Sequence, residues 1–176
     1  MDYLYLGKIV DTHGIKGEVR ILLKDFLVFD TNLNLFLSSK EINDILFIQN
    51  KYLYIGKEKK EVALTGYRHH KIYEMVTFEG ITNINEVLKY KGEKCFINRN
   101  ILKENHILIS ELINYKINFN DEDYGKVVDY QNNNGNIVLE IEGKKKYFIP
   151  VNSNFILNVD KEKRIIKVQN IEGLII

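Results

Sequence analysis

The fold can be read outward from one stretch, Gly7-Lys8-Ile9-Val10-Asp11-Thr12-His13-Gly14-Ile15-Lys16-Gly17-Glu18-Val19-Arg20-Ile21. Two apolar runs of strand character, Tyr3 to Val10 and Val19 to Leu23, flank a loop that contains two glycines. Gly14 and Gly17 allow backbone angles that a Cβ forbids, so the loop can turn tightly and expose its tip. The stretch therefore predicts two strands joined by a loop that presents polar side chains.

These polar side chains have a catalytic and a structural interpretation. His13 beside Thr12 suggests a base and a nucleophile, but a base also needs an orienting partner and an oxyanion site, and neither is recognisable. The structural interpretation is a glycine-shaped turn with a surface histidine. Gly14-x-x-Gly17 is also typical of a loop that clamps RNA backbone, but that loop lies between helices, and strands flank this one. A phosphate-binding loop is excluded because no helix and no Gly-Lys-Ser/Thr sequence follow.

Composition limits the function further. The chain has 176 residues, 45% apolar and 28% charged, which is enough for one domain or two small ones. Its formal net charge is +1, so any contact with RNA must be local or made through a protein partner. The single cysteine, Cys95, excludes an internal disulfide and a multi-cysteine zinc site, and we expect no metal and no cofactor. No apolar run reaches the roughly 18 residues of a membrane helix and no signal peptide is recognisable, so we expect a cytoplasmic protein without membrane contact.

Residues 1–99 contain mainly short strand-like runs. Asn50-Lys51 separates two of them as the turn of a predicted hairpin. Many short β-branched and aromatic runs with polar turns favour an antiparallel barrel or sandwich. After the opening pair, the predicted strands are Ile45 to Gln49, Tyr52 to Ile55, Val62 to Arg68 and Ile72 to Phe78.

A short helix is predicted between Asn83 and Gly92. Asn83 can cap its N-terminus, and Glu86 follows three residues later as in a capping box. Apolar residues then recur at helical spacing, and Gly92 is suited to the C-terminal stop. A helix of two to three turns needs packing against the strands to persist.

The second half predicts another small β-domain. Residues 100–105 are the best candidate for a linker, and residues 106–176 contain about five short strands, which favours a small closed barrel. Asn132-Asn133-Asn134-Gly135 is a strong hairpin signal, because Asn and Gly tolerate positive φ. The acidic run Asn120-Asp121-Glu122-Asp123 is a solvated turn, since a calcium loop would need a Glu at its twelfth position. The predicted fold is therefore mainly β, with two small β-barrel domains, the N-terminal one containing a short helix.

The opening stretch resembles the N-terminal signature of the RimM family, which are maturation factors of the small ribosomal subunit. The match is dense over Gly7 to Val19, with Asp11 where a small residue is commoner. Val76-Thr77-Phe78-Glu79-Gly80-Ile81, followed by the predicted helix, is similar to the family's run before a short helix. Val87 stands where relatives often have Ala.

The second half resembles the PRC-barrel, the second domain of RimM-family proteins. Many relatives have aromatic residues just before the segment that opens this barrel, and the partner protein is thought to dock near them. Here Ile107, Leu108 and Ile109 occupy these positions, so the family's contact residues are not transferred to this chain. The matching pieces, in the family's order, are Glu111-Leu112-Ile113, Tyr124-Gly125-Lys126-Val127-Val128-Asp129, Ile137-Val138-Leu139, Phe148-Ile149-Pro150, Asn158-Val159-Asp160 and Glu172-Gly173-Leu174.

The resemblance implies a non-enzymatic ribosome maturation factor that assists late assembly of the small-subunit head and efficient 16S rRNA processing. The implied partners are the immature small ribosomal subunit and the nineteenth small-subunit ribosomal protein, bound through the PRC-barrel, with small-subunit rRNA as a further candidate. We expect a monomer. The alternative function is a ligand-binding or adaptor module unrelated to ribosomes. Candidate residues for subunit or RNA contact are His13, Lys16, Arg20 and Arg68, each of which has the alternative of being an ordinary exposed polar residue.

Overall fold

The computed structural model describes residues 1–175, which form two compact units. The first unit contains Met1–Phe26 and Ser38–Lys103; the second contains Leu27–Leu37 and the chain from Glu104 onward. This division differs from the predicted boundaries of 1–99, 100–105 and 106–176. The physical reason is that residues 27–37 pair with a strand of the second unit instead of joining the first barrel.

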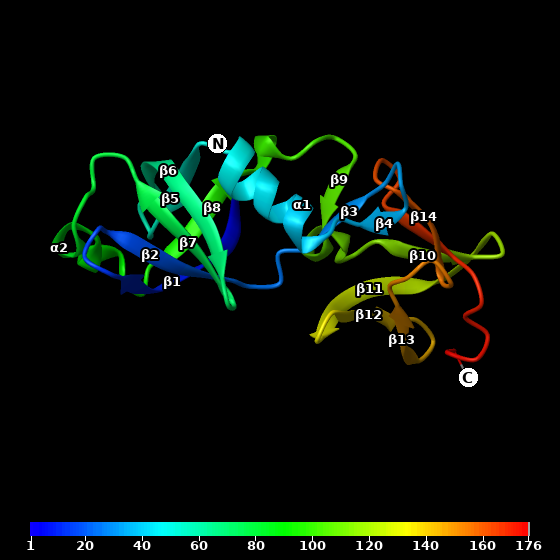
Figure 1. Cartoon of the computed structure of the whole chain (residues 1–176). Helices are drawn as coiled ribbons and strands as arrows, with labels where there is room; N and C mark the ends of the chain where they lie inside the picture. The colour runs from blue at the N-terminus through cyan, green and yellow to red at the C-terminus, as the bar shows by residue number, and fades with distance from the viewer. Residues whose placement is uncertain (176) are drawn as a thin grey trace. The chain divides into compact units, whose positions relative to one another are not determined.

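The first unit is a closed antiparallel barrel of six strands in the order β1-β2-β7-β6-β5-β8 (Figure 1). The barrel predicted for this part of the chain is confirmed. Its strands are β1 Tyr3–His13, β2 Glu18–Leu23, β5 Tyr52–Ile55, β6 Lys60–His70, β7 Tyr73–Phe78 and β8 Lys94–Asn98.

The opening stretch forms the β1–β2 hairpin as predicted, because its apolar residues alternate with polar ones. Leu6, Ile9 and Ile21 have no exposed surface, and each such burial stabilises the fold by about 1.5–3 kcal/mol. Gly7 lies where β1 and β2 approach most closely. A Cβ at this position would lie 2.2 Å from the carbonyl oxygen of Leu22, so only glycine fits.

Ile45 to Gln49 is helical, so the prediction of a strand here was wrong. Residues Ser39–Asn43 form helix α1, which continues as a wider helical stretch, η1, over Asp44–Gln49. The hairpin predicted around Asn50-Lys51 is therefore absent, and β5 begins only at Tyr52.

This helix has a clear physical origin. The side chain of Ser38 accepts a hydrogen bond from the Glu41 N–H, and the Glu41 carboxylate accepts one from the Ser38 N–H, each at 3.1 Å. This reciprocal capping box satisfies two backbone donors at the helix start. Leu46 and Phe47 are buried, and the Phe47 ring stacks on Tyr67 of β6 with centroids 4.8 Å apart.

The short helix predicted between Asn83 and Gly92 is confirmed. Asn83 accepts a hydrogen bond from the Glu86 N–H and caps α2, Ile84–Val87, which continues as the 3-10 turn η2, Leu88–Tyr90. Gly92 follows with φ of +85°, a left-handed conformation that suits a helix stop.

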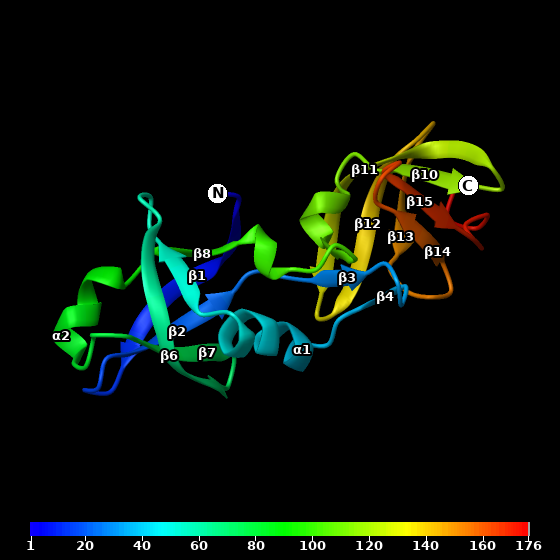
Figure 2. The ribbon, with the colours of Figure 1, turned by 90° about the horizontal axis from the view of Figure 1, so that it is seen from above.

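The second unit contains a six-stranded sheet in the order β13-β12-β11-β10-β15-β14 (Figure 2). All its pairs are antiparallel except β10 with β15, which is parallel. The strands are β10 Lys116–Phe119, β11 Glu122–Asn133, β12 Asn136–Glu142, β13 Lys146–Pro150, β14 Ile156–Asp160 and β15 Ile165–Val168.

This sheet curls around one hydrophobic core. Within residues 1–175 no ladder joins β13 to β14, so the two edge strands are connected by the chain at residues 151–155 and not by the hydrogen-bonded closure that the sequence predicted. The β11–β12 hairpin has the predicted turn, with φ of +53° at Asn134 and +91° at Gly135. Buried residues from each strand meet inside, among them Ile117, Val127, Leu139, Ile149, Val159 and Ile166.

A three-stranded sheet, β4-β3-β9, completes the second unit. Its strands are β3 Val28–Asp30, β4 Leu35–Phe36 and β9 His106–Leu108, and Figure 1 shows the blue β3 and β4 beside the green β9. Asp30 pairs with His106 in register, and both side chains are buried. One Asp30 oxygen accepts hydrogen bonds from the backbone N–H groups of Asn32 and Leu33 and from the side-chain amide of Asn105. A buried carboxylate that accepts three hydrogen bonds on one oxygen thus links the early segment 27–37 to the chain just before the late strand β9.

Candidate functional site

The loop of the opening hairpin is held against the start of α2. Gly14 and Gly17 have φ of +67° and +82°, so both adopt the left-handed conformation that the sequence suggested. A Cβ on Gly17 would lie 3.2 Å from the carbonyl oxygen of Asn83, whereas a Cβ on Gly14 would meet nothing within 4 Å. The Ile84 N–H also donates a hydrogen bond to the Ile15 carbonyl at 3.2 Å. The loop is therefore anchored at Gly17 and open at Gly14.

Three of the four candidate contact residues lie together on the outer face of the first barrel. His13 ends β1, Arg20 lies on β2 and Arg68 on β6. In the strand order β1-β2-β7-β6, β1 and β2 are neighbours and only β7 separates β2 from β6. Nη2 of Arg20 lies 2.7 Å from Nδ1 of His13. The guanidinium of Arg20 also lies over the ring of Tyr73, 5.5 Å from its centroid. We call His13, Arg20, Arg68 and their neighbour His70 the cationic face.

Arg68 is held by a carboxylate on the neighbouring hairpin. Its Nε and Nη2 donate hydrogen bonds of 3.0 and 2.7 Å to the two oxygens of Glu18. This bidentate hydrogen bond, against some desolvation, lowers the pKa of Glu18 from its ordinary value. The side chain of Arg68 remains 48% exposed, so the guanidinium is oriented but still accessible to a further anion.

His70 shows that positive groups crowd this face. Its pKa is lowered from the ordinary value, first by desolvation and then by the nearby positive charges of Arg68 and Lys71. Sequence reasoning missed His70 as a member of the site. Only the strand pairing places His70 near this face, because His70 pairs with Tyr73 of β7 and β7 pairs with β2.

Lys16, the fourth candidate, lies apart from this face at the tip of the hairpin loop. It is exposed, and its neighbour Ile15 is 79% exposed. The tip thus presents one cation and one large apolar side chain next to each other, on a loop whose base is fixed by Gly17.

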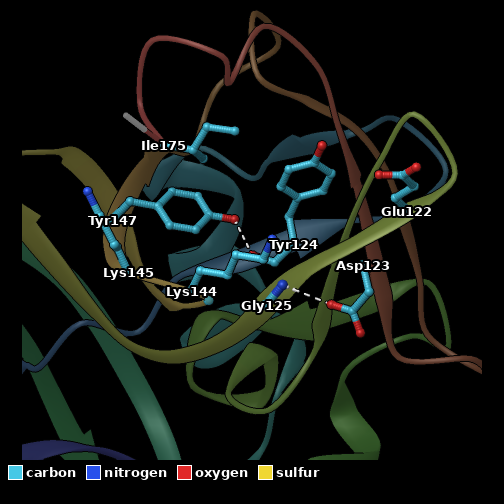
Figure 3. A pocket seen from close by; sticks show the side chains of 9 residues that line it. Glu122, Asp123, Tyr124, Gly125, Lys144, Lys145, Tyr147 and Ile175 are labelled. Carbon is cyan, nitrogen blue, oxygen red and sulfur yellow. Dashed lines mark hydrogen bonds between the residues drawn. The ribbon is translucent and has the colours of Figure 1, made fainter.

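The second unit contains a cleft of about 500 Å³, shown in Figure 3. Its base is ordered by the hydroxyl of Tyr147, which donates a 2.7 Å hydrogen bond to the Tyr124 carbonyl. Burial raises the pKa of this phenol to about 12, so it remains a donor at neutral pH. The lining residues are Glu122, Asp123, Tyr124, Gly125, Gly143, Lys144, Lys145, Tyr147 and Ile175.

Ile107, Leu108 and Ile109 belong to the core of the second unit. Ile107 and Ile109 are each 1% exposed and Leu108 is 5% exposed, because β9 pairs with β3 and faces the interior of the second unit. They are therefore not a surface on which a partner could dock.

Within residues 1–175, no group of three or more His, Cys, Asp or Glu side chains is arranged to hold a metal ion. None of the helices described is long and apolar enough to cross a membrane.

Comparison with known proteins agrees with this architecture. Residues 4–102 match the RimM N-terminal domain, and residues 109–174 match the RimM PRC barrel domain. The fold and the matches thus define a two-domain β protein, in which a RimM-type barrel precedes a PRC barrel.

Curated relatives match along nearly the whole chain. The chain is 32% identical over 177 residues to the ribosome maturation factor RimM of Staphylococcus haemolyticus, with 97% of each protein covered. It is 31% identical to that of Staphylococcus epidermidis with the same coverage. The chain therefore belongs to the RimM family of ribosome maturation factors.

Two solved structures are also similar. The RimM of Pseudomonas aeruginosa has a TM-score of 0.45 and 17% identity, covering 96% of this chain and 97% of that one. The N-terminal domain of RimM from Thermus thermophilus has a TM-score of 0.43 and 13% identity, covering 58% and 96% respectively.

Proposed function

We propose that this protein assists late assembly of the small ribosomal subunit head and thereby 16S rRNA processing, as a binding factor and not as an enzyme. The supporting observation is that both family domains match in order, and that relatives named ribosome maturation factor RimM align over 97% of the chain. The protein acts as a monomer in the cytoplasm on immature small subunits.

The cationic face contacts small-subunit rRNA in this proposal. With a net charge of +1, the chain cannot rely on its overall field, so affinity for phosphates must come from a local concentration of cations. Arg20 and Arg68 provide two guanidinium groups within one face, and guanidinium groups match phosphate geometry. Lys16 adds a separate contact from the hairpin tip.

The second domain binds the nineteenth small-subunit ribosomal protein. Its surface offers a cleft with Glu122 and Asp123 on one side and Lys145 on the other (Figure 3). It also exposes Leu33, Leu35 and Leu157, near the point where the Asn34 side chain donates a 2.8 Å hydrogen bond to the Leu157 carbonyl. Exposed apolar side chains that gather at one place are typical of surfaces that bind proteins.

Co-sedimentation of the full chain tests the proposal. Purified protein is mixed with immature small subunits, with mature small subunits or with complete ribosomes, and each mixture is separated on a sucrose gradient. We expect the protein to migrate with the immature particles and to be absent from complete ribosomes. Protein that stays at the top of every gradient would contradict the proposal and favour the adaptor alternative.

Two substitutions test the cationic face, because one should weaken and the other should strengthen binding to immature subunits. A third substitution, outside this face, is the control. Arg20→Gln removes a cation and should weaken binding to immature subunits, more strongly at low salt. Glu18→Gln removes the anion that pairs with Arg68 and should strengthen binding. Lys40→Gln is the matched control, since Lys40 is 89% exposed on α1 and lies outside this face. Equal binding by all three variants would exclude the face from RNA contact.

A further inference from the structure

A second surface of the first barrel combines aromatic rings with lysines. Tyr5 of β1 and Tyr54 of β5 both pair in register with Phe96 of β8, so the three side chains form one row across three neighbouring strands. The rings of Tyr5 and Phe96 meet edge to face at 5.7 Å, and Tyr3 meets Tyr54 in the same way at 5.0 Å. We call Tyr3, Tyr5, Tyr54 and Phe96 the aromatic row.

The aromatic row lies on the outside of the barrel. The intervening residues Leu6, Cys95 and Ile97 are fully buried, so the opposite face of these strands already fills the core. Tyr5 is 38% exposed and Tyr3 and Phe96 are partly exposed, whereas Tyr54 is buried, with 6% of its surface exposed. The core therefore does not account for the rings of Tyr3, Tyr5 and Phe96.

Lysines border these rings. Nζ of Lys59 lies 4.1 Å from the ring centroid of Phe96 and 5.9 Å from that of Tyr3. Nζ of Lys94 lies 5.8 Å from the Tyr5 ring, and Lys94 pairs in register with Lys8, which is also exposed. A carboxylate near the row, Glu61, accepts a hydrogen bond from the Tyr54 hydroxyl at 3.2 Å. The surface is therefore aromatic and positively charged.

We propose that the accessible rings of the aromatic row, those of Tyr3, Tyr5 and Phe96, form a stacking platform for unpaired RNA bases. Lys8, Lys59 and Lys94 contact the adjoining phosphates. Flat rings on the outer face of a sheet, with cations between them, are the combination that binds single-stranded nucleic acid without strict sequence preference. The lysine over Phe96 is flexible, so a base can replace it on the ring while its ammonium moves to a phosphate. The inference rests on the proposed function only in naming rRNA as the cellular ligand.

Fluorescence anisotropy with the full chain tests the platform directly. The probes are a labelled single-stranded oligouridine, an RNA duplex of the same length and a glutamate-rich peptide of similar charge. We expect the single strand to bind more tightly than the duplex or the peptide, because only unpaired bases can stack on the rings. Equal binding of the peptide would assign the surface to acidic protein segments and overturn the proposal, as would no binding of the single strand.

Matched variants separate stacking from charge. Tyr5→Leu combined with Phe96→Leu keeps the side chains apolar and should weaken single-strand binding about tenfold or more. Phe148→Leu is the control, since Phe148 is a 39% exposed ring on β13 of the other unit. Lys59→Gln with Lys94→Gln should reduce the slope of log affinity against log salt by about 0.7 for each lysine. Unchanged affinity in the ring variant would overturn the proposal.

Ultraviolet crosslinking of the unmodified chain to oligouridine gives a measurement that does not depend on how the variants fold. Mass spectrometry should locate crosslinks on the peptides that contain Tyr5 and Phe96. Crosslinks confined to the cationic face would overturn the platform. If the chain binds and crosslinks oligouridine as expected but does not sediment with immature subunits, the proposed function fails and the platform stands.

Discussion

Nη2 of Arg20 lies 2.7 Å from Nδ1 of His13, on the neighbouring strands β2 and β1. A guanidinium can only donate hydrogen bonds, so Nδ1 of His13 must be the acceptor. The imidazole in this contact is therefore neutral and has its proton on Nε2, which leaves an N–H donor on the remaining ring nitrogen.

This contact predicts the tautomer of His13. Long-range ¹H–¹⁵N correlation spectra at pH 8 should show an unprotonated Nδ1 and a protonated Nε2. Arg20→Gln removes the donor and should let both tautomers become populated. A wild-type ring protonated on Nδ1 would contradict the contact.

We predict that the Glu18–Arg68 pair makes a small contribution to the free energy of unfolding, and that this contribution depends on pH. The hydrogen bonds from Arg68 lower the pKa of Glu18 below its ordinary value of 4.5, so the stabilisation is present above about pH 4.5 and is lost as pH falls below it. Because Arg68 is 48% exposed, we expect Glu18→Gln to cost less than about 1 kcal/mol at pH 7. Urea unfolding at pH 7 and pH 3 measures this, and the difference between wild type and variant should shrink at pH 3. A cost that is larger at pH 3 would contradict the assignment.

The two loop glycines should differ in their tolerance of alanine. Gly14→Ala should lower the free energy of unfolding by about 1–2 kcal/mol, because alanine disfavours the left-handed backbone and its Cβ meets no other atom. Gly17→Ala adds the close approach to the Asn83 backbone and should cost clearly more, as judged by the free energy of unfolding. Gly14→Asn is the control, since asparagine adopts this conformation more readily. Equal losses at both positions would show that α2 does not confine the loop.

Cys95 predicts a protected thiol. Burial raises its pKa from 9.0 to about 12, so it stays protonated in the folded protein, and its stabilising contribution is lost only as pH rises from about 9 toward 12. We expect no reaction with a disulfide reagent at pH 8 in buffer and full reaction of one thiol in urea. Since the chain has a single cysteine, fast labelling of the native protein would contradict the buried position directly.

Local patterns predicted the β1–β2 hairpin, the β11–β12 hairpin and α2, because turn and capping residues act over a few positions. The same reasoning missed α1, although Ser38 and Glu41 form a capping box at its start. The reason is that the apolar residues of Ile45 to Gln49 were interpreted as a strand, whereas they are helical. Burial against Tyr67, a contact distant in sequence, favours the helix there.

Pairing between strands that are distant in the chain could not be predicted from the sequence. His13, Arg20 and Arg68 were chosen as isolated polar residues, and only the order β1-β2-β7-β6 brings them onto one face with His70. For the same reason nothing local indicated that β3, besides pairing with the adjacent β4, pairs with the distant β9.

The Asp30 carboxylate and the Asn105 amide that bonds to it are 75 residues apart in the chain. During synthesis, β3 emerges long before β9 exists, so its hydrogen-bonding edge must wait unpaired while the first barrel is being made. A waiting edge of this kind is a point at which a nascent chain can pair wrongly. The two units therefore complete their folding at different times, and the second can do so only after the intervening barrel strands have been translated.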